Sequence, residues 1–234
     1  MKKFSLKKFT SVIFLCFILN IAVSFFNDLL LLRIVRLTTT LFFFISFFYF
    51  KLNKSSLFTA IFLLLFIADI GIMYYENEWF CYFRFISFIL IYSFLGCHIF
   101  NKSIFKELKS IVPFVLIVLA ASFLFLVFKL KNVLDLNTFG IIQEYLYYVY
   151  AAVIIILIIL SIFNSLSIES KRSEVFFAIV MSFLLSDVLL MIGYYQNYFF
   201  ALQIERFFQI SAISMLFYYV FVLFNKEFSK EEVF

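Results

Sequence analysis

The sequence predicts an all-α protein, a polytopic membrane protein with eight transmembrane helices, and three observations support this. Hydrophobic residues make up 66% of the 234-residue chain and charged residues only 14%, which is more apolar surface than a soluble domain of this size can bury. The apolar runs are long enough to cross a hydrocarbon core of about 30 Å as helices. Segments of about ten residues with alternating polarity, typical of a transmembrane barrel, are not visible.

The predicted spans follow one another with short connections, so we expect a single transmembrane domain over 1–234. The first apolar run follows a lysine-rich start and resembles a signal peptide. It is long, however, and no small-residue cleavage site follows it, so we expect it to remain as the first helix. The eight spans are 9–26, 29–50, 57–75, 79–100, 111–128, 141–163, 174–193 and 203–224.

The basic residues predict the orientation of the chain in the cell membrane. Lysines and arginines gather in the N-terminus, in the second, fourth and sixth connections and in the C-terminal tail, whereas the other side clearly holds only Lys129 and Lys131. The positive-inside rule therefore predicts that both termini are cytoplasmic. Basic residues scattered along loops in this way do not predict a nucleic-acid partner. The three cysteines have no ligand or disulfide spacing, so we expect no metal and no cofactor.

A similarity between the third and seventh spans predicts an internal repeat. Asp69 and Asp187 lie 118 residues apart, each followed four residues later by methionine, and Tyr74–Asn77 resembles Tyr194–Asn197. Spans three and seven cross in the same direction, so the model they favour is two parallel four-helix repeats, at about 1–110 and 111–234. Chance similarity between two helices rich in Phe and Leu is the alternative.

Charged residues inside the spans are the strongest functional signal in the sequence. A rise of 1.5 Å per residue puts Arg36, Asp69, Arg84 and Asp187, from four helices, at one depth in the outer third. A charge at mid-bilayer costs about 2.5–3.5 kcal/mol, which makes such residues candidates for a functional site. Asp–Arg pairs that only hold helices together are the alternative. The same third holds Asn20, Glu144, Glu205 and Arg206, whereas His98 lies about 15 Å away.

These motifs resemble those of the YhhN-like family, the lysoplasmalogenases. The segment Arg36–Thr39 resembles the family's K-P-L-T start to helix two, with Arg for Lys and no proline. Ala68-Asp69 resembles its G-D pair in helix three, with Ala for Gly, and Ser186-Asp187 matches its S-D pair in helix seven. Tyr147 or Tyr150 resembles a family tyrosine. Gly96-Cys97-His98 is similar to its histidine context, but farther from Asp69.

The resemblance implies a membrane-embedded hydrolase that cleaves the vinyl ether of a lysoplasmalogen. An acid protonates the ether carbon and water captures the resulting oxocarbenium ion, so Asp69 and Asp187 are the expected catalytic pair. Arg36, Arg84 and Glu144 are the expected substrate-binding residues, with an arginine holding a lipid phosphate. The expected partners are the bilayer and such a lipid. The alternatives are a small-solute or proton-coupled carrier, and a non-catalytic scaffold with structural Asp–Arg pairs.

Overall fold

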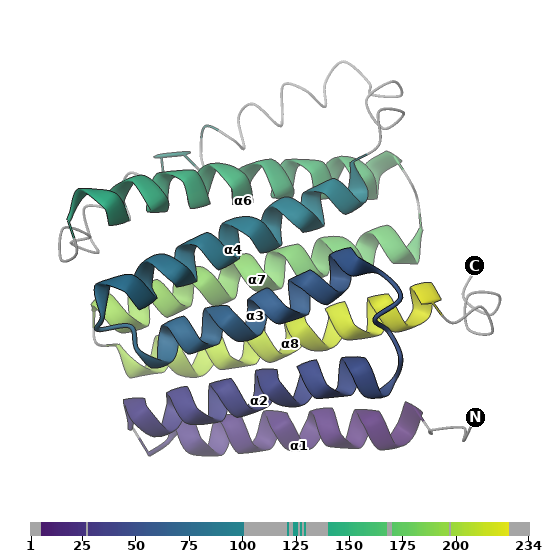
Figure 1. Ribbon diagram of the computed structural model, residues 1–234, viewed down its shortest axis with the longest axis horizontal. Helices are drawn as coiled ribbons and strands as arrows, with labels where there is room; N and C mark the ends of the chain where they lie inside the picture. Colours follow the sequence, from purple (N-terminus) through teal and green to yellow (C-terminus); the bar gives the residue numbers. More distant parts are fainter. Residues whose placement is uncertain are drawn as a thin grey trace.

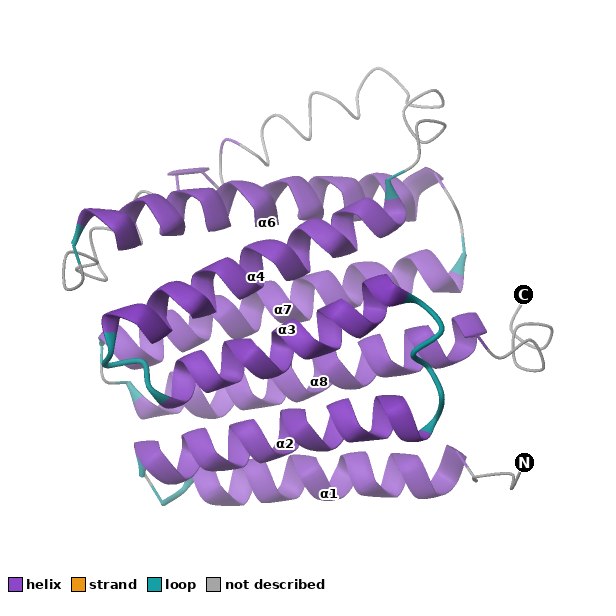
Figure 2. Cartoon of the chain, viewed as in Figure 1, coloured by secondary structure: helices purple, strands orange, loops and turns teal. Residues whose placement is uncertain are grey.

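The computed structural model describes residues 6–26, 28–100, 121, 124–125, 127, 129, 140–167, 170–196 and 198–224. These residues form an all-helical bundle without strands (Figure 2). The helices are α1 (Leu6–Ser24), α2 (Leu29–Tyr49), α3 (Ser56–Met73), α4 (Glu78–Ile99), α6 (Ile141–Ser167), α7 (Lys171–Tyr195) and α8 (Phe199–Phe224).

Six of these described helices, α2 to α4 and α6 to α8, are long and apolar enough to cross a membrane. In α1 the apolar part, Ile13–Val23, is shorter. The prediction of an all-α, multi-pass membrane protein is therefore confirmed. Seven of the predicted spans coincide with described helices, whereas the fifth, 111–128, lies almost entirely outside the described residues. The count of eight helices stays a prediction.

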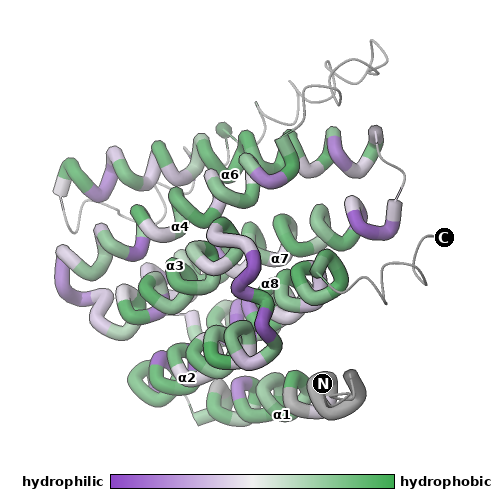
Figure 3. The backbone as a smooth tube through the Cα atoms, turned by 45° about the vertical axis from the view of Figure 1, so that its right-hand side comes forward, coloured by the Kyte–Doolittle hydropathy of each residue, from purple (hydrophilic) through white to green (hydrophobic). Residues whose placement is uncertain are grey.

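Polar residues at the connections determine where several helices begin. The Asp28 carboxylate accepts hydrogen bonds from the backbone N–H groups of Leu30 and Leu31 at the start of α2. Asn77 and Ser170 do the same at the starts of α4 and α7. These side chains satisfy N–H groups that have no partner within their helix. Hydrophobic residues dominate the helices, and hydrophilic ones gather at connections such as that between α2 and α3 (Figure 3).

The helices lie side by side along the long axis of the bundle (Figure 1). The α1 helix packs against α2 and α8 at one edge, and α6 packs against α4 and α7 at the other. The start of α1 and the end of α8 lie at the same end of the bundle, and α4 and α6 run in the same direction (Figure 1). The membrane side that this end occupies stays a prediction.

Phenylalanine side chains fill the half of the bundle near the start of α1 and the end of α8. The rings of Phe47 and Phe62 stack with centroids 4.6 Å apart, and Phe217 packs on Phe43 at 6.2 Å and on Phe62 at 6.3 Å. All four are buried. Aromatic pairs of this kind contribute about 0.5–1.5 kcal/mol beyond the burial of their area. This half is therefore a largely apolar core, and the buried charged residues lie in the other half.

Two glycines permit a close approach between helices at the polar end. A Cβ atom on Gly71 of α3 would lie 2.8 Å from the backbone oxygen of Phe80 and 3.1 Å from Cβ of Arg84 in α4. A Cβ atom on Gly193 of α7 would lie 2.3 Å from the Leu202 side chain of α8. Both glycines lie within continuous helices. They are packing residues, and the helices do not break at them.

We expect Gly71→Ala to destabilise the protein, because the added methyl group meets a backbone carbonyl that cannot move aside. Overpacking of this kind costs about 1–3 kcal/mol. The control is Gly96→Ala, whose Cβ atom would meet Leu160 at 3.7 Å and Leu157 at 3.9 Å, ordinary contact distances. Thermal unfolding in detergent should show a lower Tm for the first variant only. Equal Tm values would contradict the packing role of Gly71.

Candidate functional site

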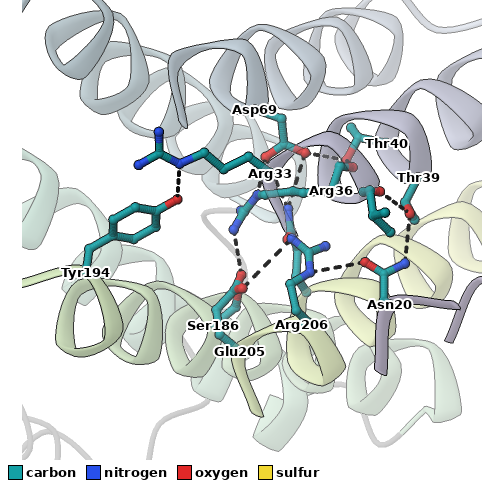
Figure 4. Close-up of polar contacts among 12 residues, drawn as sticks. Asn20, Arg33, Arg36, Thr39, Thr40, Asp69, Ser186, Tyr194, Glu205 and Arg206 are labelled. Atoms are coloured by element: carbon teal, nitrogen blue, oxygen red, sulfur yellow. Dashed lines mark hydrogen bonds and ion pairs between the residues drawn. The ribbon is translucent and has the colours of Figure 1, made fainter. Parts of the chain in front are cut away.

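Two buried polar clusters occupy the interior of the other half of the bundle. The first, which we call the arginine cluster, brings together side chains of five helices (Figure 4). The second, the tyrosine cluster, consists of Asp187 of α7 with Tyr92 of α4 and Tyr150 of α6. The members of the arginine cluster are Asn20, Arg36, Thr39, Thr40, Asp69, Ser186, Glu205, Arg206 and Gln209.

Arg36 is the centre of the arginine cluster. Its Nε donates to Oδ1 of Asp69 at 2.7 Å, and its Nη1 donates to Oε1 of Glu205 at 2.8 Å. Arg36 is 2% exposed, and Glu205 is fully buried. Hydrogen bonds between charged groups are about twice as strong as those between neutral groups. One guanidinium group therefore ties α2 to α3 and α8 inside the bundle.

Both oxygens of Asp69 are engaged. Besides the bond from Arg36, the Thr40 hydroxyl donates to Oδ2, and Nε2 of Gln209 lies 3.3 Å from Oδ1 and 3.4 Å from Oδ2. The Asp69 side chain is 1% exposed. Such surroundings, with one cation and two neutral donors, suit an ionised carboxylate.

Arg206 extends the cluster to α1. Its Nε donates to Oδ1 of Asn20 at 3.2 Å, and Asn20 in turn donates to the Thr39 hydroxyl at 2.9 Å. Nη1 of Arg206 lies 3.9 Å from Oε2 of Glu205, whose Oε1 also accepts from Ser186 at 2.9 Å. The two arginines and two carboxylates balance in charge, so the cluster is neutral overall.

Several atoms of the arginine cluster are buried and have no hydrogen-bond partner within the part of the chain that the structure describes. A buried polar atom left unpaired costs about 1–3 kcal/mol. Water or a small polar group would therefore bind favourably among them. These atoms are Nη2 of Arg36, Oε2 of Glu205, Nη1 of Arg206 and Oε1 of Gln209.

The tyrosine cluster holds Asp187 by one oxygen only. The hydroxyl groups of Tyr92 and Tyr150 both donate to Oδ2, the second at 2.5 Å. Both of these hydrogen bonds reach the same oxygen. Asp187 is 2% exposed and both tyrosines are buried. The two oxygens of this carboxyl group therefore differ in their surroundings, unlike those of Asp69.

Arg84 supplies a cation beside the tyrosine cluster. Its guanidinium carbon lies 5.4 Å from the ring centre of Tyr75, 5.5 Å from that of Phe85 and 5.7 Å from that of Phe88. Cation–π contacts of this kind stabilise a desolvated cation by about 2 kcal/mol. Arg84 is 3% exposed, and its charge acts on Asp187. Its Nε has no hydrogen-bond partner among the residues that are described.

Further polar contacts lie at the same end of the bundle, near the turn between α3 and α4. Arg33 of α2 forms hydrogen bonds of 2.8 and 2.5 Å with the Glu76 carboxylate and donates to the Tyr194 hydroxyl at 2.8 Å. The hydroxyl groups of Tyr75 and Tyr195 are 2.7 Å apart. The bonds from Arg33 hold the pKa of Glu76 below its usual value.

The predicted site residues separate into two groups. Arg36 contacts Asp69 in the arginine cluster, and Arg84 neighbours Asp187 in the tyrosine cluster. The two aspartates do not hydrogen-bond to each other and share no hydrogen-bond donor. Glu144 is half-buried in the first turn of α6 and is not a member of either cluster as defined above. The catalytic and substrate-binding roles stay predictions.

Other sequence features lie apart from these clusters. The His98 ring packs on Phe58, with centroids 4.8 Å apart, and its Nε2 lies 3.0 Å from the Tyr219 hydroxyl near the end of α4. Among the described residues, no group of three or more His, Cys, Asp or Glu side chains could hold a metal ion. Sequence reasoning did not find Tyr92, Thr40 or Gln209, because hydroxyl and amide side chains are less conspicuous than charges in apolar helices.

Comparison with known proteins found no match to the chain among family models, curated proteins or solved structures.

We expect Arg36→Met to destabilise the fold far more than Arg33→Met. Removing Arg36 leaves Asp69 and Glu205 buried without their cation, a change that costs about 3–5 kcal/mol. The partner of Arg33 is Glu76, whose side chain is 71% exposed, and a pair of that kind contributes about 0–1 kcal/mol. Thermal or denaturant unfolding in detergent measures the loss of stability in each variant. Equal losses would show that the Arg36 contacts do not hold the bundle together.

Acidification should remove the contribution of the Arg33–Glu76 pair. The pKa of Glu76 is lowered on folding, so its stabilisation is present above the usual value of 4.5 and is lost as pH falls through the lower folded value. Because Glu76 is mostly exposed, the effect is below about 1 kcal/mol. The Tm difference between wild type and Glu76→Gln should shrink between pH 7 and pH 3.5. A difference independent of pH would contradict this role of Glu76.

Proposed function

We propose that the protein is a membrane-embedded hydrolase that cleaves the vinyl ether of a lipid, or a similar ether, by acid catalysis. The motifs that resemble the lysoplasmalogenases suggest this reaction. The observation that carries the proposal is the state of Asp187, a buried carboxyl group whose Oδ2 accepts hydrogen bonds from two tyrosine hydroxyls. Ionisable residues of this kind inside a membrane span mark functional sites by default.

The hydrogen bonds of Asp187 suit a proton donor. In the protonated acid, Oδ2 is the carbonyl oxygen that accepts from Tyr92 and Tyr150, and Oδ1 carries the proton. That proton passes to the outer carbon of the vinyl ether, and the double-bond electrons form the new C–H bond. The oxocarbenium ion captures water, which returns a proton to Asp187, and the resulting hemiacetal collapses to an aldehyde and an alcohol.

The remaining site residues take supporting roles in this proposal. Arg84, buried and with an unpaired Nε, binds the phosphate of the lipid head group. Asp69 contributes a fixed negative charge that stabilises the cation and holds Arg36 in place, since three side chains already donate to it. Glu144 is proposed to contact the substrate at the end of α6 where that helix begins.

The neighbours of the two aspartates also support the proposal of eight helices in two parallel repeats. Asp69 of α3 is held by side chains of α2 and α8, and Asp187 of α7 by side chains of α6 and α4. If each helix number is advanced by four, with the count returning to α1 after α8, then α2, α3 and α8 become α6, α7 and α4. Gly71 and Gly193 likewise lie where α3 meets α4 and where α7 meets α8. We infer that the two clusters are equivalent positions that carry different chemistry.

One observation bears on each alternative. Carriers often interrupt their helices at the binding site, whereas α3 and α7 are continuous through Asp69 and Asp187. The arginine cluster by itself suits the scaffold alternative, because its charges pair with one another. That alternative does not account for the two tyrosine hydroxyls on one oxygen of Asp187, or for an Arg84 Nε that has no partner among the described residues.

We expect Asp187→Asn to abolish the release of fatty aldehyde from lysoplasmalogen by the purified protein. Loss of a general acid lowers the rate by about 10²–10⁴-fold. Tyr92→Phe and Tyr150→Phe should each lower it less, because either hydroxyl still binds Oδ2 in the absence of the other. The control is Tyr219→Phe, which removes a buried hydroxyl that contacts His98 and should leave the rate unchanged.

Thermal unfolding of the same variants separates a loss of chemistry from a loss of fold. Asp69→Asn should lower both the rate and the Tm, since it disturbs the partner of Arg36. Full activity in Asp187→Asn would remove that residue from the mechanism. If the wild-type protein released no aldehyde but took up solute with protons in proteoliposomes, the carrier would replace the hydrolase.

A further inference from the structure

An apolar groove of about 350 Å³ lies between α4 and α6. From α4 it is lined by Tyr92, Gly96 and Phe100, which are spaced four residues apart and so follow one face of the helix. The facing residues of α6 are Val153, Leu157 and Leu160. None of the described lining residues is charged. The chemistry of this surface suits a hydrocarbon chain.

The groove runs along the bundle and ends at the tyrosine cluster. Because α4 and α6 run in the same direction (Figure 1), the groove extends from Tyr92 and Val153 toward Phe100 and Leu160, over about 12 Å. Tyr92 lines the groove and also donates to Asp187. Tyr150, the other donor to Asp187, precedes Val153 by about one helical turn. Tyr92 therefore connects this end of the groove to Asp187.

A cation lies beyond this end. Arg84 precedes Tyr92 by about two turns of α4, on the side away from the groove. Arg84 is buried, and its Nε has no hydrogen-bond partner among the described residues. Its guanidinium carbon lies over the Phe88 ring, and its charge acts on Asp187. Along α4 the order is therefore a cation, a carboxyl group held through Tyr92, and an apolar groove.

We propose that this groove binds the hydrocarbon chain of a single-chain lipid, with the ether at Asp187 and the head-group phosphate at Arg84. The inference rests on the proposed function and extends it by assigning a site for the hydrocarbon chain. A volume near the lower limit of ligand pockets, about 300 Å³, accommodates one chain and not two. Such a lipid has a polar head group, a reacting ether bond and an apolar chain in that order. This matches the order of the cation, the carboxyl group and the groove along α4.

Cys97 offers a direct probe of occupancy, because it lines the groove and is exposed. In a variant with Cys16→Ser and Cys81→Ala, in nanodiscs of diacyl phosphatidylcholine, maleimide would label Cys97. We expect long-chain lysophosphatidylcholine, at ten times its Kd, to slow the labelling about tenfold by mass action. Glycerophosphocholine, the same head group without a chain, should not slow it. A rate unaffected by the long-chain lipid would overturn the proposal, and would mean that bilayer lipid or another segment already covers the groove.

A pair of variants on α6 tests the location. Ile156 lines the groove, so Ile156→Trp should abolish the protection of Cys97 and raise KM for the long-chain ether about tenfold, with kcat retained. Val149→Trp is the control, since Val149 is an exposed residue about two turns earlier and is not among the described lining residues. Identical protection and KM in the two variants would place the chain elsewhere.

The two proposals fail in different ways. Protection of Cys97 by the long-chain lipid without hydrolysis of any ether lipid would uphold the groove and reject the hydrolase. Hydrolysis without protection, or protection by the head group alone, would uphold the enzyme and overturn the groove. Arg84→Met should weaken the protection of Cys97 by lysophosphatidylcholine but not its protection by a long-chain alcohol. Equal weakening for both probes would contradict the ordering along α4.

Discussion

The bridge from Arg36 to Asp69 and Glu205 is the contact on which the arrangement of the bundle depends. Each of these charges is costly in a membrane, so the helices that carry them must approach with their charged faces turned together. Two hydrogen bonds of 2.7 and 2.8 Å then fix the depth and the rotation of α2, α3 and α8. Apolar contacts alone would not fix them as well, since hydrophobic residues occur all around α3 and α8.

The two buried aspartates have different surroundings. Asp69 has a guanidinium group, a hydroxyl and an amide around both of its oxygens, which suits a permanent charge. Asp187 has hydroxyl groups on one oxygen, and its nearby cation, Arg84, is engaged with aromatic rings. The first arrangement holds helices together. In the second, two tyrosine hydroxyls bind a single oxygen, and for this reason we propose Asp187 as the proton donor.

Depth could be predicted from the sequence, whereas rotation about the helix axis could not. The rise per residue placed Arg36 and Asp69 at one level, and the structure joins them. The same arithmetic put Asp187 at that level, but it could not show that Asp187 faces Tyr92 and Tyr150 instead of Asp69. Uniformly apolar helices give no periodic signal for their facing side. Tyrosine hydroxyls are also inconspicuous beside charges, so the tyrosine cluster could be found only from coordinates.

Side chains fill the space between helices in the apolar half of the bundle but leave a groove between α4 and α6. Stacked phenylalanines near the start of α1 fill the space between α2, α3 and α8. Gly96 lies between α4 and α6 and has no side chain to fill the space there. A Cβ atom on Gly96 would make only ordinary van der Waals contacts. The space is thus available without strain, and Tyr92 connects it to Asp187. The two aspartates are equally buried, and the groove lies beside Asp187 because Tyr92 belongs both to its lining and to the tyrosine cluster.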